Sequence, residues 1–293
     1  MLLSPFGTSA NIVDRTPLPP PLLLPGRASL PVLLSVAHAG RDYPDWLLAQ
    51  SRRGRASLEP LEDPLVDRLA WRALALGVPG VVARAPRAAI DCNRGPHEIN
   101  RAASAVPQGE DPGLRARAGL GLIPTRTAKH GDLWRGPVGP AELKLRMQEA
   151  YVPFHSGIRE GLDALLHRHG AALLLDCHSM PARGSRMPAV VIGDRHGTSA
   201  TSFLSAHAGR IVRNAGFSVA FNDPYAGGWI AGSHGSPAVG RHVLQIEIDR
   251  GEYLDAKLRE PGPGFDRVAR LLERLAAELG DALAHAVLPA AAE

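Results

Sequence analysis

Polar side chains that can do chemistry follow several apolar runs of this sequence. His38 comes after PVLLSVA, and His178 comes after AALLLD. Asn93 and Arg94 follow AAIDC, and Glu247 lies near the end of VLQIEI. Such runs are typical of buried strands. Because ligands of open α/β sheets bind beyond the carboxyl ends of the strands, we expect these side chains to form one site.

The two histidines indicate a metal site. Imidazole nitrogens from separate strands suit zinc, and a catalytic zinc needs three protein ligands and one open position. The third ligand is expected to be a carboxylate, with Asp63 as first choice and Asp42 as the alternative. Asp176 shares a strand face with His178, where it could orient the imidazole by accepting a hydrogen bond. The competing interpretation makes both His38 and His178 ordinary buried histidines.

Glu247 is the predicted general base. It is flanked by Ile246 and Ile248, and apolar surroundings raise the pKa of a carboxylate. Such a group can take a proton from a water that the metal activates and deliver it to the leaving amine. The competing interpretation is a structural ion pair with Arg241 or Arg250.

Asn93 and Arg94 are predicted to bind a substrate carboxylate, because a guanidinium offers two parallel donors. A structural pairing of Arg94 with Asp91 or Glu98 is the alternative. Arg126, in a Gly/Pro-rich loop, is a weaker candidate for a second anion contact or for stabilising an oxyanion.

The segment 222–229 reads NDPYAGGW and predicts a loop that contacts the ligand. Tyr225 and Gly228 are its candidate substrate-binding residues, since glycine lets the backbone approach a ligand closely. His234, shortly after it, could stabilise developing charge. An ordinary turn is the alternative for this segment.

The elements that must position these residues alternate between strands and helices, which predicts a layered α/β domain with helices on both faces of a sheet. Strands are expected at residues 31–37, 78–83, 88–92, 171–176, 189–193, 218–221 and 243–248. Helices are expected at residues 63–76, 142–169 with a break near Pro153, 201–215 and 264–287. Residues 104–140 are expected to form a long functional loop.

The domain organisation is predicted to be simple. Residues 1–29 read as a Pro-rich arm, and residues 30–293 as a single catalytic domain. Hydrophobic residues make up 45% of the 293, which is enough for a sizeable core. The net charge of +4 comes from scattered arginines and carries no nucleic-acid signature, so a small anionic substrate is the expected partner. The oligomeric state is left open.

The cysteines and the apolar runs bear on the compartment. Cys92 and Cys177 form no disulfide framework, and reduced thiols fit a cytoplasmic protein. Cys177 and the histidine after it would point to opposite strand faces, which argues against a Cys–His dyad. No apolar run reaches about 18 residues, and no signal peptide is recognisable, so neither a membrane span nor export is expected.

Several of these segments together resemble a known family. SVAHAGRDYP, AIDCNRGPHEIN, GLGLIPTR, LLLDCHSMP, VIGDRHG, FNDPYAGGWI and LQIEIDR occur in the order seen in N-formylglutamate amidohydrolases. The resemblance spans about residues 30–255. That family is similar to the zinc carboxypeptidase and aspartoacylase group. The resemblance implies a three-layer α/β/α fold with a central mixed, mostly parallel sheet and one Zn²⁺.

The resemblance also implies roles for individual residues. His38 and His178 match the metal histidines, Asn93 and Arg94 match the carboxylate-binding pair, and Glu247 matches the general base. The wider group takes its carboxylate ligand from H-x-x-E, whereas the third residue after the first histidine here is an arginine. The carboxylate ligand must therefore come from elsewhere in the chain.

The implied reaction is hydrolysis of N-formyl-L-glutamate to formate and L-glutamate, a step of histidine degradation. A zinc peptidase or cell-wall amidase on the same scaffold is the first alternative, although it would need export or an open cleft. A binding protein that has lost catalysis is the second, and the presence of both histidines and Glu247 argues against it.

Overall fold

A mixed sheet forms the centre of the molecule. The computed structural model describes residues 15–27, 29–100, 103, 111–182, 184 and 187–287. Within these residues, seven strands pair in the order β1-β3-β2-β6-β9-β7-β8. The strands are β1 (Leu22–Leu24), β2 (Val32–Val36), β3 (Gly80–Val82), β6 (Ala172–Met180), β7 (Val190–Gly193), β8 (Val219–Phe221) and β9 (Arg241–Asp249). The strands β3, β2, β6 and β9 run parallel. The edge strand β1 is antiparallel to β3, and β7 is antiparallel to β9 but parallel to β8. The predicted mixed, mostly parallel sheet is confirmed.

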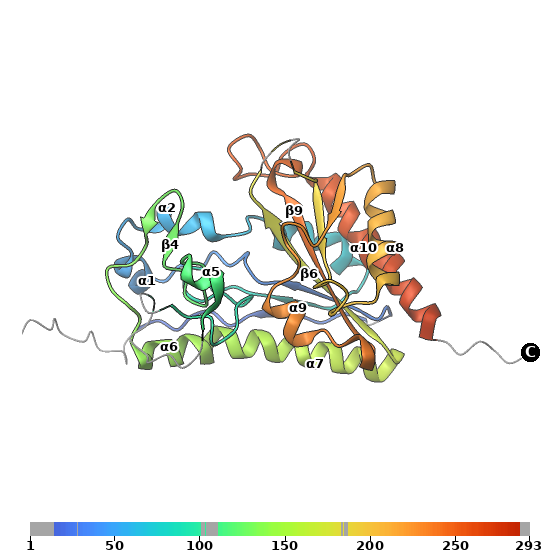
Figure 1. Cartoon of the computed structure of the whole chain (residues 1–293), viewed down its shortest axis with the longest axis horizontal. Coiled ribbons are helices and arrows are strands. Elements are labelled where there is room, and N and C mark those ends of the chain that lie inside the picture. The colour runs from blue at the N-terminus through green and yellow to red at the C-terminus, as the bar shows by residue number, and fades with distance from the viewer. Residues whose placement is uncertain are drawn as a thin grey trace, which may run out of the picture.

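Helices cover both faces of this sheet, as Figure 1 shows for α7 on one side and α8 and α10 on the other. One core cluster joins Leu34 to the helices α3 (Val66–Leu69), α4 (Trp71–Ala75), α8 (Ser202–Asn214) and α10 (Phe265–Val287). The other joins Leu33 to α1 (Asp45–Gln50), α2 (Arg55–Leu58), α7 (Val152–His169) and α9 (Trp229–His234). Because neighbouring strand residues point to opposite faces, Leu33 and Leu34 anchor different layers. The three-layer α/β/α architecture is confirmed.

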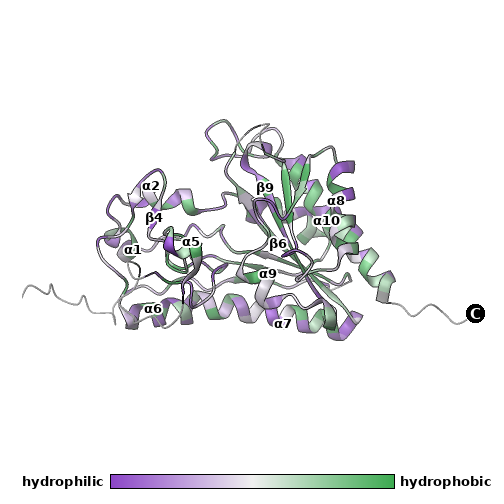
Figure 2. Ribbon diagram, viewed as in Figure 1, coloured by the Kyte–Doolittle hydropathy of each residue, from purple (hydrophilic) through white to green (hydrophobic). Residues whose placement is uncertain are grey.

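The longest helical segment contains the predicted break. It begins as α6 (Pro140–Arg146), widens into a π-helical turn at Met147–Tyr151 and continues as α7. Pro153 follows directly and has no N–H for the helical ladder, which explains the irregularity at this point. In Figure 2 these helices alternate between hydrophilic and hydrophobic colours along their length, as expected for helices with one buried face.

Two expected elements are wrong. The helix expected at residues 63–76 begins only at Val66, because the backbone N–H of Asp63 bonds the carbonyl of His38 and Leu65 adopts a φ of 61°. It is also divided at Ala70 into α3 and α4. Residues 88–92 form turns instead of a strand. There the Asp91 carboxylate accepts a hydrogen bond from the backbone N–H of Asn93, a local bond that competes with strand pairing.

The ends of the predicted segments also differ from the structure. Leu22–Leu24 pairs with β3, so the sheet includes part of the predicted arm at residues 1–29, whose first 14 residues lie outside the described part of the chain. The loop at 104–140 contains α5 (Gly113–Arg117) and a hairpin of β4 (Arg126–Thr127) and β5 (Gly131–Asp132). Within the described residues, we find no helix with the length and hydrophobicity that a membrane span requires.

Candidate functional site

The predicted site residues meet at the carboxyl end of the parallel strands. His38 lies two residues beyond β2, whereas His178 and Glu247 lie within β6 and β9, near the carboxyl ends of these strands rather than beyond them. The two strands pair His178 with Glu247 and Asp176 with Gln245. Because strand side chains alternate, these four residues project to the same side of the sheet.

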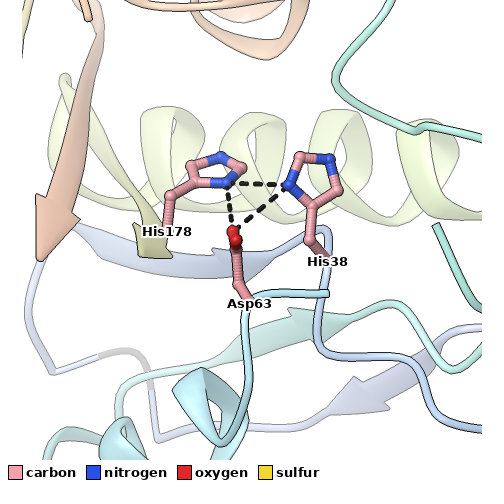
Figure 3. A group of neighbouring side chains, drawn as sticks. All are labelled: His38, Asp63 and His178. Atoms are coloured by element: carbon pink, nitrogen blue, oxygen red, sulfur yellow. Dashed lines mark hydrogen bonds and ion pairs between the residues drawn. The ribbon is translucent and has the colours of Figure 1, made fainter. Parts of the chain in front are cut away.

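His38, Asp63 and His178 form a buried triangle of ligand atoms (Figure 3). The Asp63 Oδ2 atom lies 3.2 Å from His38 Nδ1 and 3.1 Å from His178 Nδ1, and the two Nδ1 atoms are 3.2 Å apart. Ligands of a tetrahedral zinc with bonds of about 2 Å are about 3.3 Å apart. The triangle therefore matches one face of such a coordination sphere and could hold a metal ion.

A carboxylate fixes the proton of each imidazole on the far side of this triangle. His38 Nε2 lies 2.7 Å from Asp91 Oδ1, and His178 Nε2 lies 2.8 Å from Asp176 Oδ2. With the ring protons on Nε2, both Nδ1 atoms present lone pairs to the Asp63 oxygen. Three acceptors thus face one another with no described donor between them, an arrangement that a cation satisfies.

The electrostatics of the triangle point the same way. Burial opposes ionisation of Asp63, but the hydrogen bonds and positive charge of the two histidines hold its pKa well below the usual range. Burial would lower the pKa of His178, yet the nearby Asp176 and Asp63 raise it well above the ordinary value. The cluster therefore requires positive charge, which a proton or a metal ion can supply.

Asp63 is the carboxylate of the triangle, and Asp42 is not. Asp42 pairs with Arg84 on the surface, with about half of its side chain exposed. Asp63 has a second partner, because its Oδ1 atom accepts a hydrogen bond of 3.1 Å from Arg250. The guanidinium of Arg250 also donates to the hydroxyl of Ser179.

Glu247 is a buried carboxylate beside the triangle. Its Oε1 atom accepts a hydrogen bond of 2.9 Å from the amide of Gln245. Burial raises the pKa of Glu247, with a further contribution from the charge of Asp63. The alternative of an ion pair with Arg241 or Arg250 is wrong, because Arg241 pairs with Asp163 and Arg250 contacts Asp63.

Asn93 and Arg94 are already partly engaged by the protein. The Asn93 amide accepts from the backbone N–H of Ile230 and donates to Gln245. Arg94 donates from Nε to the Leu120 carbonyl and from one terminal nitrogen to the Asn93 carbonyl. One terminal nitrogen of Arg94 is left for a ligand within the described residues, and Glu98 lies 3.9 Å away from its Nε atom.

A pocket of about 600 Å³ opens over these residues. Its lining includes nine of the ten predicted site residues, namely His38, Asp63, Asn93, Arg94, Arg126, His178, Tyr225, Gly228 and Glu247. The tenth, Asp176, lies behind His178, where it was expected. His234 does not line the pocket and instead lies 2.8 Å from His155, between their ring nitrogens.

Three further residues of the site were not predicted. Arg87 donates to Asp91 and the Leu61 carbonyl, and together with Gln245 and Arg250 it lines the pocket. Gln245 could have been found from its spacing, because it stands two residues before Glu247 on the same strand face. Arg87 directly precedes the segment at 88–92 that was expected to be a strand and instead forms turns, so the sequence did not indicate where its side chain points.

Comparison with known proteins decides the family. The model of the N-formylglutamate amidohydrolase family matches residues 30–254. The chain belongs to this family. The predicted resemblance, and with it the prediction of an enzyme, is confirmed.

Individual proteins of this family are similar to this chain over most of its length. An N-formylglutamate deformylase of Pseudomonas putida is 29% identical over 234 residues, 77% of this chain and 82% of that protein. The N-formylglutamate amidohydrolase of Ralstonia eutropha JMP134 superposes with a TM-score of 0.84 and 30% identity, covering 92% of this chain and 99% of that one. The gene product Atu2144 of Agrobacterium tumefaciens shares the fold, with a TM-score of 0.64 and 20% identity over 92% of this chain and 95% of that one.

Proposed function

We propose that this chain hydrolyses the amide bond of N-formyl-L-glutamate, releasing formate and L-glutamate, and that it requires a divalent metal, with zinc as the native ion. The observation that carries this proposal is the His38–Asp63–His178 triangle beside Glu247 in a cationic pocket. The names of the relatives from Pseudomonas putida and Ralstonia eutropha support the choice of substrate. We place the reaction in the cytoplasm and in histidine degradation.

The ligand set favours zinc over harder ions. Two imidazoles and one carboxylate suit zinc, whereas magnesium and calcium prefer oxygen ligands. When bound, the metal would act as a Lewis acid on the formyl carbonyl and activate water. The remaining chemistry belongs to side chains of the pocket.

Glu247 serves as general base and acid. Its carboxylate has a raised pKa, which suits a group that must gain and lose a proton near neutral pH. Gln245 occupies the Oε1 atom, so Oε2 is the oxygen that takes the proton from the attacking water. The same oxygen returns the proton to the nitrogen of the departing glutamate.

Two arginines handle the negative charge of the reacting molecule. Arg87 donates from Nε to Asp91 and from one terminal nitrogen to the Leu61 carbonyl. Its other terminal nitrogen has no partner among the described residues and can donate to the oxygen that becomes negative. The free terminal nitrogen of Arg94 binds the α-carboxylate of the substrate, and its bond to the Asn93 carbonyl fixes the guanidinium.

Formate release from N-formyl-L-glutamate tests the proposal, measured before and after chelation and after zinc is added back. We expect activity that is lost with the chelator and restored by zinc. Glu247→Gln should keep its zinc and lose activity by about a thousandfold or more, because general acid–base catalysis contributes about 10² to 10⁴. Release that survives complete metal removal would contradict the metal requirement. Absence of release from a zinc-loaded protein would contradict the substrate and favour a peptidase or another acyl group.

A further inference from the structure

Three cations of the pocket have no part in the metal centre. Arg115 on α5, Arg126 on β4 and Lys129 in the turn after β4 all line the pocket and are exposed. None of them has a carboxylate partner within the part of the chain that is described. The guanidinium of Arg115 lies over the ring of Tyr225, 5.8 Å from its centre. We call Arg115, Arg126 and Lys129 the rim cations.

The other arginines of the pocket differ from the rim cations. Arg87 pairs with Asp91, and Arg250 pairs with Asp63, so both neutralise carboxylates of the metal centre. The rim cations thus leave positive charge at the pocket mouth that no described protein group balances. Unpaired cations that share one pocket wall raise the local concentration of anions and favour a ligand with negative charge at that point.

The rim cations are held on a connected platform. Asn100 ties α5 to the hairpin, because its amide donates to the Ala116 carbonyl and to the Thr125 hydroxyl. The backbone N–H of Arg126 bonds the carbonyl of Gly119 at the end of α5. A β-carbon at Gly119 would lie 2.7 Å from that of Arg126, so the two segments approach as closely as a glycine permits. This contact fixes where the Arg126 side chain begins.

The buried arginines of the site are mostly engaged by protein groups within the described residues, because Arg87 and Arg250 pair with Asp91 and Asp63. Arg94 has a single free nitrogen, and both groups of the Asn93 amide have protein partners. N-formyl-L-glutamate carries two carboxylates, so its distal one needs another cationic partner. A pocket of about 600 Å³ is large enough for that group to reach the mouth region.

We propose that the rim cations form a subsite for the distal carboxylate of the substrate and make this enzyme selective for N-acyl dicarboxylic amino acids. The inference rests on the proposed function for the identity of the substrate and assigns the recognition of its second charge. Because the rim cations are exposed, this recognition is screened by salt, unlike the contacts of the buried Arg94.

The test compares N-formyl-L-glutamate with N-formyl-L-glutamine, which has the same shape and a neutral distal amide. Two variants are compared with wild type: a double variant that combines Arg126→Gln and Lys129→Gln, and the single variant Arg115→Gln. Arg117→Gln is the control, because Arg117 lies on the same short helix, pairs with Asp111 and does not line this pocket. Binding of the products L-glutamate and L-glutamine to the zinc-loaded proteins is measured in parallel by calorimetry.

Wild type is expected to prefer the dicarboxylate, and the double variant should lose about 10- to 100-fold in kcat/KM for it, mainly through KM, as expected for a lost charged hydrogen bond. Turnover of the glutamine analogue and the behaviour of Arg117→Gln should stay within a few-fold of wild type. Equal losses for both substrates, or equal binding of L-glutamate and L-glutamine by wild type, would overturn the subsite. Preferential binding of L-glutamate without any turnover would uphold the subsite while the proposed reaction fails.

Discussion

Each histidine of the triangle is oriented by a carboxylate that does not line the pocket. Asp91 and Asp176 accept from the Nε2 atoms, and each has a further partner of its own, Arg87 and the hydroxyl of Ser35 respectively. These chains hold both rings in one tautomer and one orientation. The geometry of the candidate metal site therefore depends on the carboxylates behind the histidines and on the partners of those carboxylates.

Replacing Asp176 by Asn should weaken the metal site. The amide keeps the shape of the carboxylate and loses its charge, so the His178 proton is held less firmly on Nε2. We expect metal affinity to fall about 10- to 100-fold, as is typical for partners of metal ligands. Competition with a chromogenic chelator measures it. Asp42→Asn is the control, because Asp42 pairs with Arg84 on the surface; equal affinity of both variants would contradict the role of Asp176.

The sequence could identify the kinds of residues at the site better than their partners. The histidines and Glu247 were predictable because each ends or interrupts an apolar run, a pattern that strand burial produces. Asp63 was preferred to Asp42 as the carboxylate ligand, but the sequence left both open, because the position of Asp63 depends on a backbone hydrogen bond to His38 across 25 residues. Long-range contacts of this kind leave no local pattern.

At the scale of elements, the turn that carries Asn93 connects several parts of the site. The backbone of α9 begins on this turn, because Ile230 donates to the Asn93 amide. The preceding loop donates from the Gly228 N–H to Gln245 on β9. The Asn93 amide itself fills the space where a side chain at Gly228 would lie. The close approach that glycine permits here is therefore to Asn93.

Gly228→Ala should impair turnover more than folding. A β-carbon at this position would lie 2.3 Å from the Asn93 Oδ1 atom, so the amide and the attached turn must shift. We expect kcat/KM to fall about 100-fold, because small displacements in an active site have effects of this size. Gly232→Ala, one turn later in α9, is the control, since the atoms nearest to its β-carbon belong to the flexible end of Arg195, at 3.1 Å and beyond. Full activity of Gly228→Ala would show that the position of Asn93 is unimportant.

The helices and strands were predictable where the hydrophobic pattern is continuous. The strand at 171–176 and the helix at 264–287 were found because their hydrophobic pattern is continuous, and both occur as β6 and α10. The strand expected at 88–92 was wrong although the segment is equally apolar and buried. Local bonding by Asp91 decides its conformation, and hydrophobicity alone does not distinguish a buried turn from a buried strand.

At the scale of the whole molecule, a second pair of histidines joins the layer of α7 to the site. His155 on α7 lies with Nε2 3.0 Å from the Cys92 carbonyl and with Nδ1 2.8 Å from His234 Nε2 on α9. Because His155 donates from Nε2, its Nδ1 atom is the acceptor of the proton on His234. The bond between the rings is lost once both imidazoles are protonated, because both facing nitrogens then carry protons. The hydrogen bond from His155 to the Cys92 carbonyl holds the backbone next to Asn93.

The charges around the pair keep it neutral. Burial lowers the pKa of both rings from 6.5 to about 4, and the charge of Arg159 acts in the same direction on each. His234 is lowered further by His155 and by Arg241, whereas the hydrogen bond to Cys92 and the charge of Asp176 oppose the shift. Tyr151 and Phe154 cover the ring of His155 and add no charge.

This pair should make the free energy of unfolding fall between pH 6.5 and about 4. In that window the unfolded histidines bind protons and the folded ones do not, so stability rises with pH and is lost on acidification. Below about pH 4 the folded pair is protonated as well, and this contribution has no further slope. Urea unfolding of the zinc-loaded protein across this range measures the effect.

The variant for this measurement is His155→Gln with His234→Gln, which keeps polar side chains and removes both titrations. All proteins in the comparison contain the same metal ligands, so the difference in slope isolates the pair. His285→Gln, at an exposed position of α10, is the control and should keep the slope of wild type. A double variant with an unchanged slope would show that the pair already binds protons in the folded state. A shallower slope would establish that α7 and α9 are joined by two neutral imidazoles, so that acid lowers the stability of the fold by protonating these histidines in the unfolded chain.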